Sequence, residues 1–162
     1  MIKFKLLRKG AVLPTRGTAH AGAFDLFAPE GGNIWPGEIQ KIGLGIAHDV
    51  PDEHPFEVPD SRTVVGLNCE QPMRLQGLLF GRSGLATKNR IRCFYSPCLI
   101  DADYRGELFI TLENCGHQAW HYHQGDRIGQ IMYIPAWFGD IAQTFELTET
   151  ARGDGGHGST GR

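Results

Sequence analysis

The chain lacks any apolar run that approaches the roughly 20 residues needed to span a bilayer. Its first residues, MIKFKLLRKG, carry interspersed basic side chains and contain no apolar segment typical of a signal peptide. We therefore expect a cytoplasmic protein without a membrane partner. An excess of positive charge is lacking as well, since the 162 residues have a formal net charge of −2. This charge balance argues against nucleic acid as a partner.

Cysteine pairs of the CxxC type are also missing, although the chain has four cysteines: Cys69, Cys93, Cys98 and Cys115. Without such a pair, the usual signature of a zinc or redox site is missing. Without an export signal, we expect free thiols in a reducing cytosol. His117, His121 and His123 lie near Cys115 in the sequence. The HYH pattern places two imidazoles on one strand face with no companion cysteine pair, so we expect no metal there.

Helix-forming stretches are scarce, whereas the chain contains 22 Gly and 9 Pro. Short segments rich in β-branched and aromatic residues predict strands. These segments are Lys3–Leu7, Ile39–Val50 (broken by Gly43 and Gly45), Glu107–Asn114, Gln118–His123, Arg127–Ile134 and Ala142–Thr148. Only Gly81–Asn89 favours a helix, of about two turns. Many short strands separated by turn residues predict an all-β fold, an antiparallel barrel or jelly roll.

Two segments do not fit such a barrel. The region from Asp49 to Leu75 contains four Pro and mixed charge, and we interpret residues 51–75 as an extra segment inserted in a domain of residues 1–150. The end of the chain, ARGDGGHGSTGR (residues 151–162), contains five Gly among twelve residues. Because it has little to bury, it cannot build a core, and we expect a flexible C-terminal arm.

Four internal stretches contain more polar residues than barrel strands need. They are AGAFDLFAP (residues 21–29), GRSGLATK (81–88), LIDADYRGEL (99–108) and GDRIGQI (125–131). Each one alone is typical of an ordinary turn, in which Asp side chains bind nearby backbone N–H groups. Asp103 in particular suits a turn-capping role.

Together, however, the stretches supply the groups that bind a nucleotide. Hydrogen-bond donors for an anion are available on Arg82, Ser83, Gly84 and Gln130. Carboxylates for water or a metal are available on Asp25, Asp101 and Asp103. Tyr104 adds a flat face that suits a sugar. The C-terminal arm adds Arg152, Gly155, Gly156, His157 and Ser159, whose Gly-rich backbone can wrap phosphates and whose imidazole can cover a base.

These motifs resemble those of the trimeric dUTP pyrophosphatases (dUTPases). AGAFDL, GRSGLA, IDADYRGEL, GDRIGQI and RGDGGHGSTG resemble the five family motifs, in the family's order. The resemblance implies a jelly-roll-like β-barrel with one short helix, assembled as a homotrimer with active sites shared between subunits. It implies hydrolysis of dUTP to dUMP and pyrophosphate with Mg²⁺. The C-terminal arm would then close over a site built by other subunits.

The resemblance also implies roles for individual residues. Asp101 would activate the water that attacks the α-phosphorus, and Tyr104 would pack under the deoxyribose. Asp25 would orient waters on Mg²⁺ or pair with an arginine of the arm. For Arg127, a role in a structural ion pair is as good an interpretation as a role in the site. The expected substrate-binding residues are Arg82, Ser83, Gly84, Tyr95, Cys98, Leu99, Ile100, Tyr104, Gln130, Arg152, His157, Gly158 and Ser159.

Three residues depart from the family pattern where it contacts uracil. Tyr95 replaces the usual Asn, Cys98 replaces a frequent Gly, and His157 replaces the usual stacking Phe. Imidazole covers less apolar area than phenyl, and it titrates near neutral pH. These departures leave open a modified deoxyuridine triphosphate, or another deoxypyrimidine triphosphate, as the substrate.

Two other functions fit less well. The related dCTP deaminases need Ser-Ser-x-x-Arg in the second motif and a Glu in the strand after the third, whereas this chain has Ser83-Gly84-Leu85-Ala86-Thr87 and Thr111. A purely regulatory protein on the same fold would be expected to lose Asp101, Tyr104 or the arm, and all are present. An added binding role beside catalysis stays open.

Overall fold

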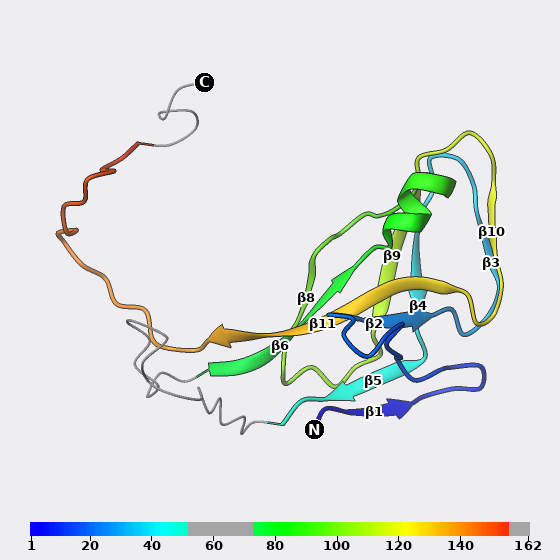
Figure 1. Ribbon diagram of the computed structural model, residues 1–162, viewed down its shortest axis with the longest axis horizontal. Helices are drawn as coiled ribbons and strands as arrows, with labels where there is room; N and C mark the ends of the chain where they lie inside the picture. The colour runs from blue at the N-terminus through cyan, green and yellow to red at the C-terminus, as the bar shows by residue number, and fades with distance from the viewer. Residues whose placement is uncertain (52–72, 156–162) are drawn as a thin grey trace.

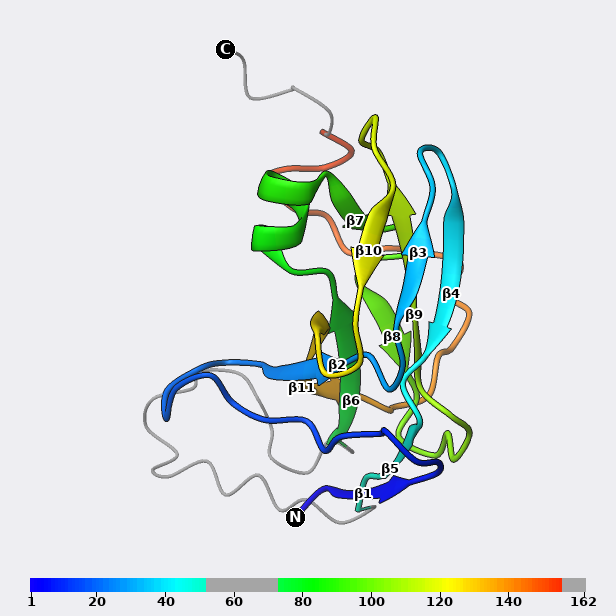
Figure 2. The same ribbon diagram turned by 90° about the vertical axis from the view of Figure 1, so that its right-hand side faces the viewer.

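Antiparallel strands form nearly all of the regular structure. The computed structural model describes residues 1–51 and 73–155. Its strands are β1 (Lys3–Leu6), β2 (Phe24–Phe27), β3 (Gly32–Ile34), β4 (Ile39–Gly43), β5 (Ile46–Asp49), β6 (Met73–Phe80), β7 (Ile91–Cys93), β8 (Cys98–Ile100), β9 (Phe109–Asn114), β10 (Trp120–Tyr122) and β11 (Arg127–Trp137). The one helical element in these ranges is η1 (Leu85–Asn89), a turn of π-helix next to β7 (Figure 2). The predicted all-β class is confirmed.

The strands group into four antiparallel sheets (Figure 1). The largest has the order β2-β11-β6-β8, and a second has the order β4-β9-β7. Two-stranded ribbons, β1-β5 and β10-β3, complete the arrangement. The described strands do not close into one continuous hydrogen-bonded barrel, so the jelly-roll arrangement consists of sheets packed around a shared core.

Side-chain alternation explains how these sheets bury that core. In β9, buried and half-buried residues alternate along the whole strand, which places Ile110, Leu112 and Asn114 inward. Strand β11 passes over Ile110 at Gly129, where a Cβ atom would lie 2.6 Å from Ile110 Cδ1. Glycine therefore permits this close approach. The core comprises Leu26, Ile34, Leu44, Ile46, Leu79, Ile91, Leu108, Ile110, Leu112, Ile128 and Ile131 with their neighbours.

The predicted strand over Ile39–Val50 is two strands that belong to different sheets. Gly45 has φ +67°, a left-handed conformation that glycine adopts at little cost. Before it, β4 pairs with β9, and after it, β5 pairs with β1. The turn therefore carries the chain from one sheet to another.

One predicted strand is wrong. Ala142–Thr148 forms no strand and pairs with no other part of the described chain. Its apolar side chains are almost fully exposed, with Phe145 at 95% and Leu147 at 86%. Residues 138–155 run away from the sheets (Figure 1). Alternation alone did not make a strand, because a strand also needs a partner for its backbone hydrogen bonds and this segment has none in the described chain.

Five strands were not predicted: the short strands β2, β3, β7 and β8, and the eight-residue strand β6. The predicted helix is confirmed in place but is shorter than two turns. Of the predicted extra segment, residues 52–72 lie outside the described residues, and its last residues, from Met73 to Leu75, begin β6.

Asn114 is a fully buried polar residue whose side chain makes three hydrogen bonds. Its Nδ2 donates to the carbonyls of Ile34 and Gln118, at 2.8 Å each, and its Oδ1 accepts from the N–H of Gly116 at 2.8 Å. The amide therefore joins the end of β9 to β3 and to the turn before β10. Buried polar groups need such partners because water is not available to replace them.

Asn114→Ala is expected to lower the free energy of unfolding by about 3 kcal/mol, because it leaves buried backbone groups unpaired. Urea denaturation followed by tryptophan fluorescence measures the change. Asn33→Ala is the matched control, since its bond to His121 is exposed, and it is expected to cost less than about 1 kcal/mol. Equal losses for the two variants would contradict this role of Asn114.

Candidate active site

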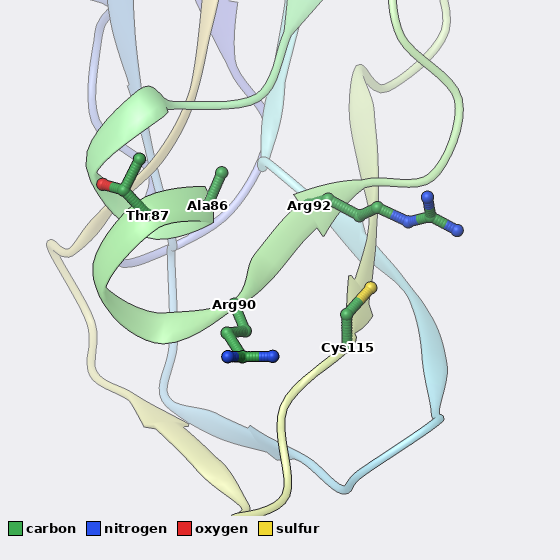
Figure 3. A pocket seen from close by; sticks show the side chains of 5 residues that line it. All are labelled: Ala86, Thr87, Arg90, Arg92 and Cys115. Carbon is green, nitrogen blue, oxygen red and sulfur yellow. The ribbon is translucent and has the colours of Figure 1, made fainter.

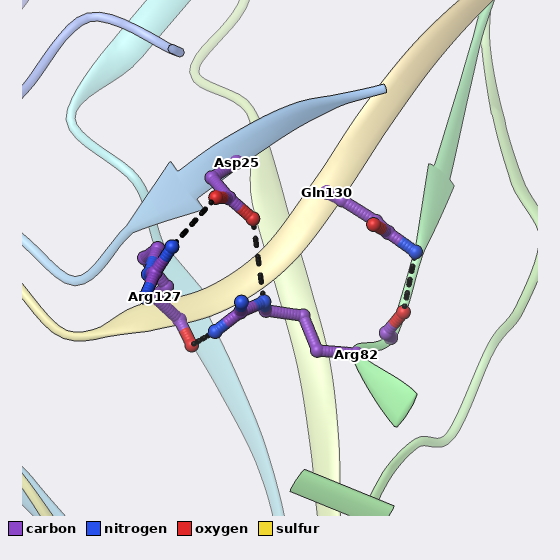
Figure 4. A network of polar contacts seen from close by, with 5 residues as sticks. Asp25, Arg82, Arg127 and Gln130 are labelled. Carbon is purple, nitrogen blue, oxygen red and sulfur yellow. Dashed lines mark hydrogen bonds and ion pairs between the residues drawn. The ribbon is translucent and has the colours of Figure 1, made fainter. Parts of the chain in front are cut away.

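Asp25 on β2 is the centre of an ion-pair network that joins three of the four polar stretches (Figure 4). Its Oδ1 lies 3.3 Å from Arg82 Nε, and its Oδ2 lies 3.2 Å from Arg127 Nη1. Arg82 Nη1 also donates to the Arg127 carbonyl at 3.2 Å. The Asp25 carboxylate is mostly buried, with 13% of the side chain exposed, so these pairs are shielded from solvent more than surface pairs are.

This network holds the Arg82 guanidinium in place while leaving part of it unused. A guanidinium has five N–H donors, and the described contacts occupy two of them. The side chain is 29% exposed. Arg82 can therefore receive an anion at its outer edge without rearrangement.

Gln130 lies beside this network because strand register places it there. It pairs with Asp25 on one side and with Phe80 on the other, and paired residues project from the same face of a sheet. Its Nε2 donates to the carbonyl of Gly81 at 3.2 Å, which fixes the amide next to the segment that carries Arg82. One N–H of the amide stays available for a ligand.

A cavity of about 390 Å³ opens at this point. Arg82, Ser83 and Gln130 line it together with Cys93, at the end of β7, and Ser96, in the loop between β7 and β8. The cavity therefore joins the second and fourth stretches to the loop that precedes the third. Gly84 lies beside Ser83, and a Cβ atom at Gly84 would meet nothing within 4 Å, so its backbone is open to approach.

The third stretch forms a tight turn after β8. The N–H of Tyr104 donates to the carbonyl of Asp101 at 3.1 Å, which is the hydrogen bond that closes a β-turn. The Asp101 residue is exposed. Tyr104 is 39% exposed, and its hydroxyl donates to the carbonyl of Glu107 at 3.1 Å. Gly106 permits this ring position, since a Cβ atom there would lie 2.4 Å from the Tyr104 hydroxyl.

The loop and strand β8 before Asp101 expose some predicted residues and bury another. Tyr95 is 64% exposed and Leu99 is 55% exposed, so both can meet a ligand. Ile100 has its side chain in the core, which limits any ligand contact to its backbone. The thiols of Cys93 and Cys98 are half-buried, and burial raises the pKa of each.

One chain does not bring Asp101 to the Asp25–Arg82 network. Gln130 pairs with Phe80, whereas Asp101 lies one residue beyond the pair formed by Gly77 and Ile100. At about 3.3 Å per residue, Asp101 is about 13 Å further along the strands. The two groups therefore lie toward opposite ends of the β6–β8 pair.

A second pocket, of about 520 Å³, lies between η1 and the end of β9 (Figure 3). Ala86, Thr87, Arg90, Arg92 and Cys115 line it. Arg92 is already paired with Glu113 at 2.7 Å. None of the predicted site residues that the structure describes lines this pocket.

The arm is described only in part. Arg152 is exposed, and its Nε donates to the nearby carbonyl of Gly155 at 2.9 Å. His157, Gly158 and Ser159 lie outside the described residues. Among residues 1–51 and 73–155, no three His, Cys, Asp or Glu side chains gather as a metal site, and no helix is long and apolar enough to cross a membrane.

Sequence reasoning left the role of Arg127 open, and the structure assigns it to the ion pair with Asp25. It also missed His48, which is almost fully buried. A single His in an apolar strand has no local pattern that distinguishes it. Its contacts are with residues far away in the sequence.

Comparisons with known proteins identify the family of the chain. The sequence model of the dUTPase family matches residues 57–161. The deoxyuridine 5'-triphosphate nucleotidohydrolase of Nautilia profundicola is 35% identical over 99% of both chains. That of Rhizobium etli is 37% identical over 74% of this chain and 78% of its own length.

Solved structures show the same fold. The dUTPase of Staphylococcus bacteriophage 80alpha with dUPNHPP superposes with a TM-score of 0.81 at 23% identity, over 100% of this chain and 99% of its own. A point mutant of the dUTPase of phage phi11 of S. aureus, described with a structural Mg(II) ion, has a TM-score of 0.71 at 20% identity, over 91% of this chain and 98% of its own. The fold is thus the jelly roll of these phage enzymes. With the family match and the 35% identity over nearly the whole length, the chain belongs to the dUTPase family.

Thiol labelling tests the described environment of the cysteines. A thiolate is the reacting species, and burial raises the pKa of Cys93 and Cys98, so both should react slowly at neutral pH. Cys115 is exposed and should react with iodoacetamide well before them. Mass spectrometry of the labelled peptides resolves each site. Labelling of Cys93 at the rate of Cys115 would contradict this arrangement.

Proposed function

We propose that the protein hydrolyses dUTP to dUMP and pyrophosphate. The observation that carries the proposal is the convergence of Asp25, Arg82 and Gln130, from three separate stretches of the chain, beside one cavity. The membership of the chain in the dUTPase family supports it, as do curated relatives named deoxyuridine 5'-triphosphate nucleotidohydrolase.

In this proposal, the Arg82 network binds the phosphate chain. Asp25 holds Arg82 in a fixed direction, and the free edge of its guanidinium forms paired hydrogen bonds with phosphate oxygens. The second N–H of Gln130 and the open backbone at Ser83 and Gly84 supply further donors. Preorganised donors of this kind need little rearrangement when charge develops on the phosphates.

Asp101 is the proposed base. Its carboxylate accepts a proton from a water molecule and directs that water in line at the α-phosphorus, with pyrophosphate as the leaving group. Tyr104, held in the same turn, presents a flat and partly exposed ring to the deoxyribose. In this proposal, the ring leaves no room for a 2′-hydroxyl, so the site prefers deoxynucleotides.

The side chains of the site fit a Mg²⁺ ion held mainly by the substrate. Both oxygens of Asp25 already bind guanidinium groups, so Asp25 suits contact with the ion through water. Mg²⁺ commonly keeps several waters and binds substrate phosphates with few protein ligands. When bound, the ion would neutralise phosphate charge and fix the geometry of the triphosphate.

We also propose a homotrimer in which each site is shared. The separation of Asp101 from the Arg82 network along β6 and β8 supports this, because one chain alone leaves the base about 13 Å along the strands from the phosphate donors. A neighbouring copy would supply Asp101 to the network of the first. Such sharing makes activity dependent on assembly.

Pyrophosphate release from dUTP, dTTP, dCTP and UTP, each with Mg²⁺, tests the proposed substrate. We expect the highest kcat/KM for dUTP, because backbone groups around Leu99 read the ring edge and Tyr104 excludes ribose. Tyr95, Cys98 and His157 keep the alternative open, and a higher kcat/KM for dCTP or for a 5-substituted deoxyuridine triphosphate would establish it instead.

In the same assay, Asp101→Asn is expected to lower kcat by about 10² or more while nucleotide binding persists, because the amide keeps the shape and loses the basicity. Asp103→Asn is the matched control, and its kcat is expected to stay within a few-fold of wild type. An Asp101→Asn variant with near-wild-type kcat would exclude Asp101 as the base.

We further propose that residues 151–162 form an arm that closes over the bound nucleotide, with Arg152 on phosphate, His157 on the base, and Gly158 and Ser159 beside them. Truncation before Arg152 is expected to lower kcat strongly, because the site stays open to water. The melting temperature and the oligomeric state should change little. His157→Phe should keep or raise activity through its larger apolar face. A truncated protein that retains its kcat, or one that dissociates into monomers, would contradict the proposed closing role of the arm.

A further inference from the structure

His48 on β5 is a buried histidine whose two ring nitrogens both have hydrogen-bonding partners. Only 2% of the residue is exposed. Its ring lies between those of Phe4 and Tyr133, with centroid distances of 6.4 and 5.9 Å. Nδ1 lies 2.8 Å from the Tyr133 hydroxyl, and Nε2 lies 3.3 Å from the backbone carbonyl of Asp101.

These partners determine which nitrogen carries the proton. A carbonyl oxygen only accepts, so Nε2 of His48 must donate to Asp101. In the neutral ring, Nδ1 is then the acceptor, and the Tyr133 hydroxyl donates to it. Burial lowers the pKa of His48 and raises the pKa of Tyr133, so both groups are neutral at neutral pH. A directed chain of hydrogen bonds therefore runs from Tyr133 through His48 to Asp101.

The chain ends on the atom that organises the proposed catalytic turn. The carbonyl of Asp101 also accepts the N–H of Tyr104 at 3.1 Å. The His48 N–H thus binds the carbonyl that closes the turn bearing both the proposed base and the proposed sugar platform. A second link from β5 joins Asp49 to Arg105 at 3.0 Å. That pair is about half exposed on both sides, so it holds the turn less firmly.

A core-filling role alone does not account for His48. An aliphatic residue would fill the same space without the cost of burying two polar nitrogens, a cost that is offset only when both are paired. Both are paired here, one to a turn and one to a residue of the four-stranded sheet. His48 therefore connects the turn to two sheets at once, from a buried position.

We propose that His48, held in the Nε2–H tautomer by the Asp101 carbonyl and oriented by Tyr133, is a positioning residue that sets the place of Asp101 for attack. This inference rests on the proposed function, since it assumes that Asp101 activates the water. Attack in line is sensitive to displacements of about 1 Å. Phosphate binding depends on Arg82 and Gln130, which lie toward the other end of the strands. Loss of the His48 bond should therefore lower kcat more than it raises KM.

Two amide variants separate the two nitrogens of the ring. The Gln amide places an N–H where Nε2 lies, whereas the shorter Asn amide reaches only the position of Nδ1. His48→Asn is expected to lower kcat for dUTP about tenfold with less than a twofold change in KM. His48→Gln is expected to stay within about threefold of wild type, because it restores the donor to Asp101. Melting temperatures confirm that each variant is folded.

Equal kcat values for the folded Asn and Gln variants would overturn the inference. If neither folds, Tyr133→Phe decides, since it keeps the aromatic ring of residue 133 and removes only the hydroxyl that orients the imidazole of His48. It is expected to lower kcat at least twofold, and an unchanged kcat would overturn the inference.

The ring ¹⁵N chemical shifts of His48 provide a readout that is independent of activity. The wild type should show the Nε2–H tautomer, and a Nδ1–H tautomer would overturn the inference. Wild type and Asp101→Asn are assayed beside the variants. An inactive wild type, or an active Asp101→Asn, would count against the proposed function, whereas equal Asn and Gln variants of His48 in an active enzyme count only against the positioning role.

Discussion

Strand β11 is paired on both of its edges, and the geometry of the candidate site depends on that pairing. It pairs with β2 over Arg127–Ile131 and with β6 over Gln130–Trp137. Arg127 and Gln130 are thereby placed against Asp25 and beside the segment that follows β6. Further along the same strand, Tyr133 reaches His48. A register slip of one residue would move all of these side chains to the opposite face of the sheet.

The ion pairs around Asp25 affect the orientation of side chains more than the stability of the fold. In the proposed function Arg82 binds phosphate, which requires free N–H donors, and it uses only part of its donor set in the described contacts. The carboxylate that orients it is itself neutralised by Arg127. The result is one net positive charge beside the cavity, directed by a mostly buried anion. Because the orientation of the Arg82 guanidinium is already fixed, it can bind an anionic ligand without first being reoriented.

Sequence patterns predicted those strands in which apolar side chains alternate and in which neighbouring strands pair with the segment. Strand β9 is an example, because its alternating apolar residues have neighbours on both edges. The segment Ala142–Thr148 has a similar pattern but no paired neighbour in the described chain, so the prediction failed there. Strands β2 and β8 were missed because they are three or four residues long and contain or adjoin the polar residues Asp25 and Asp101. A polar site residue at a strand end interrupts the pattern on which prediction relies.

The candidate site was predictable to the extent that its chemistry is local. Motif residues such as Arg82, Asp101 and Gln130 could be named from short stretches. The pairing of Arg127 with Asp25 was open, since the two residues are 102 positions apart. His48 gave no local signal at all, because its partners are 53 and 85 positions away. What sequence patterns leave out is therefore the set of contacts that orient the named residues.

Two features of the single chain support the proposed homotrimer. Asp101 and the Arg82 network lie apart along β6 and β8, and the segment beyond β11 leaves Phe145 and Leu147 almost fully exposed. Exposed apolar side chains of this size along one segment are uncommon in a protein that acts alone. In the proposed homotrimer, a neighbouring copy covers that segment and completes the site in the same step. Burial of apolar area would then supply the free energy that brings the base and the phosphate donors together.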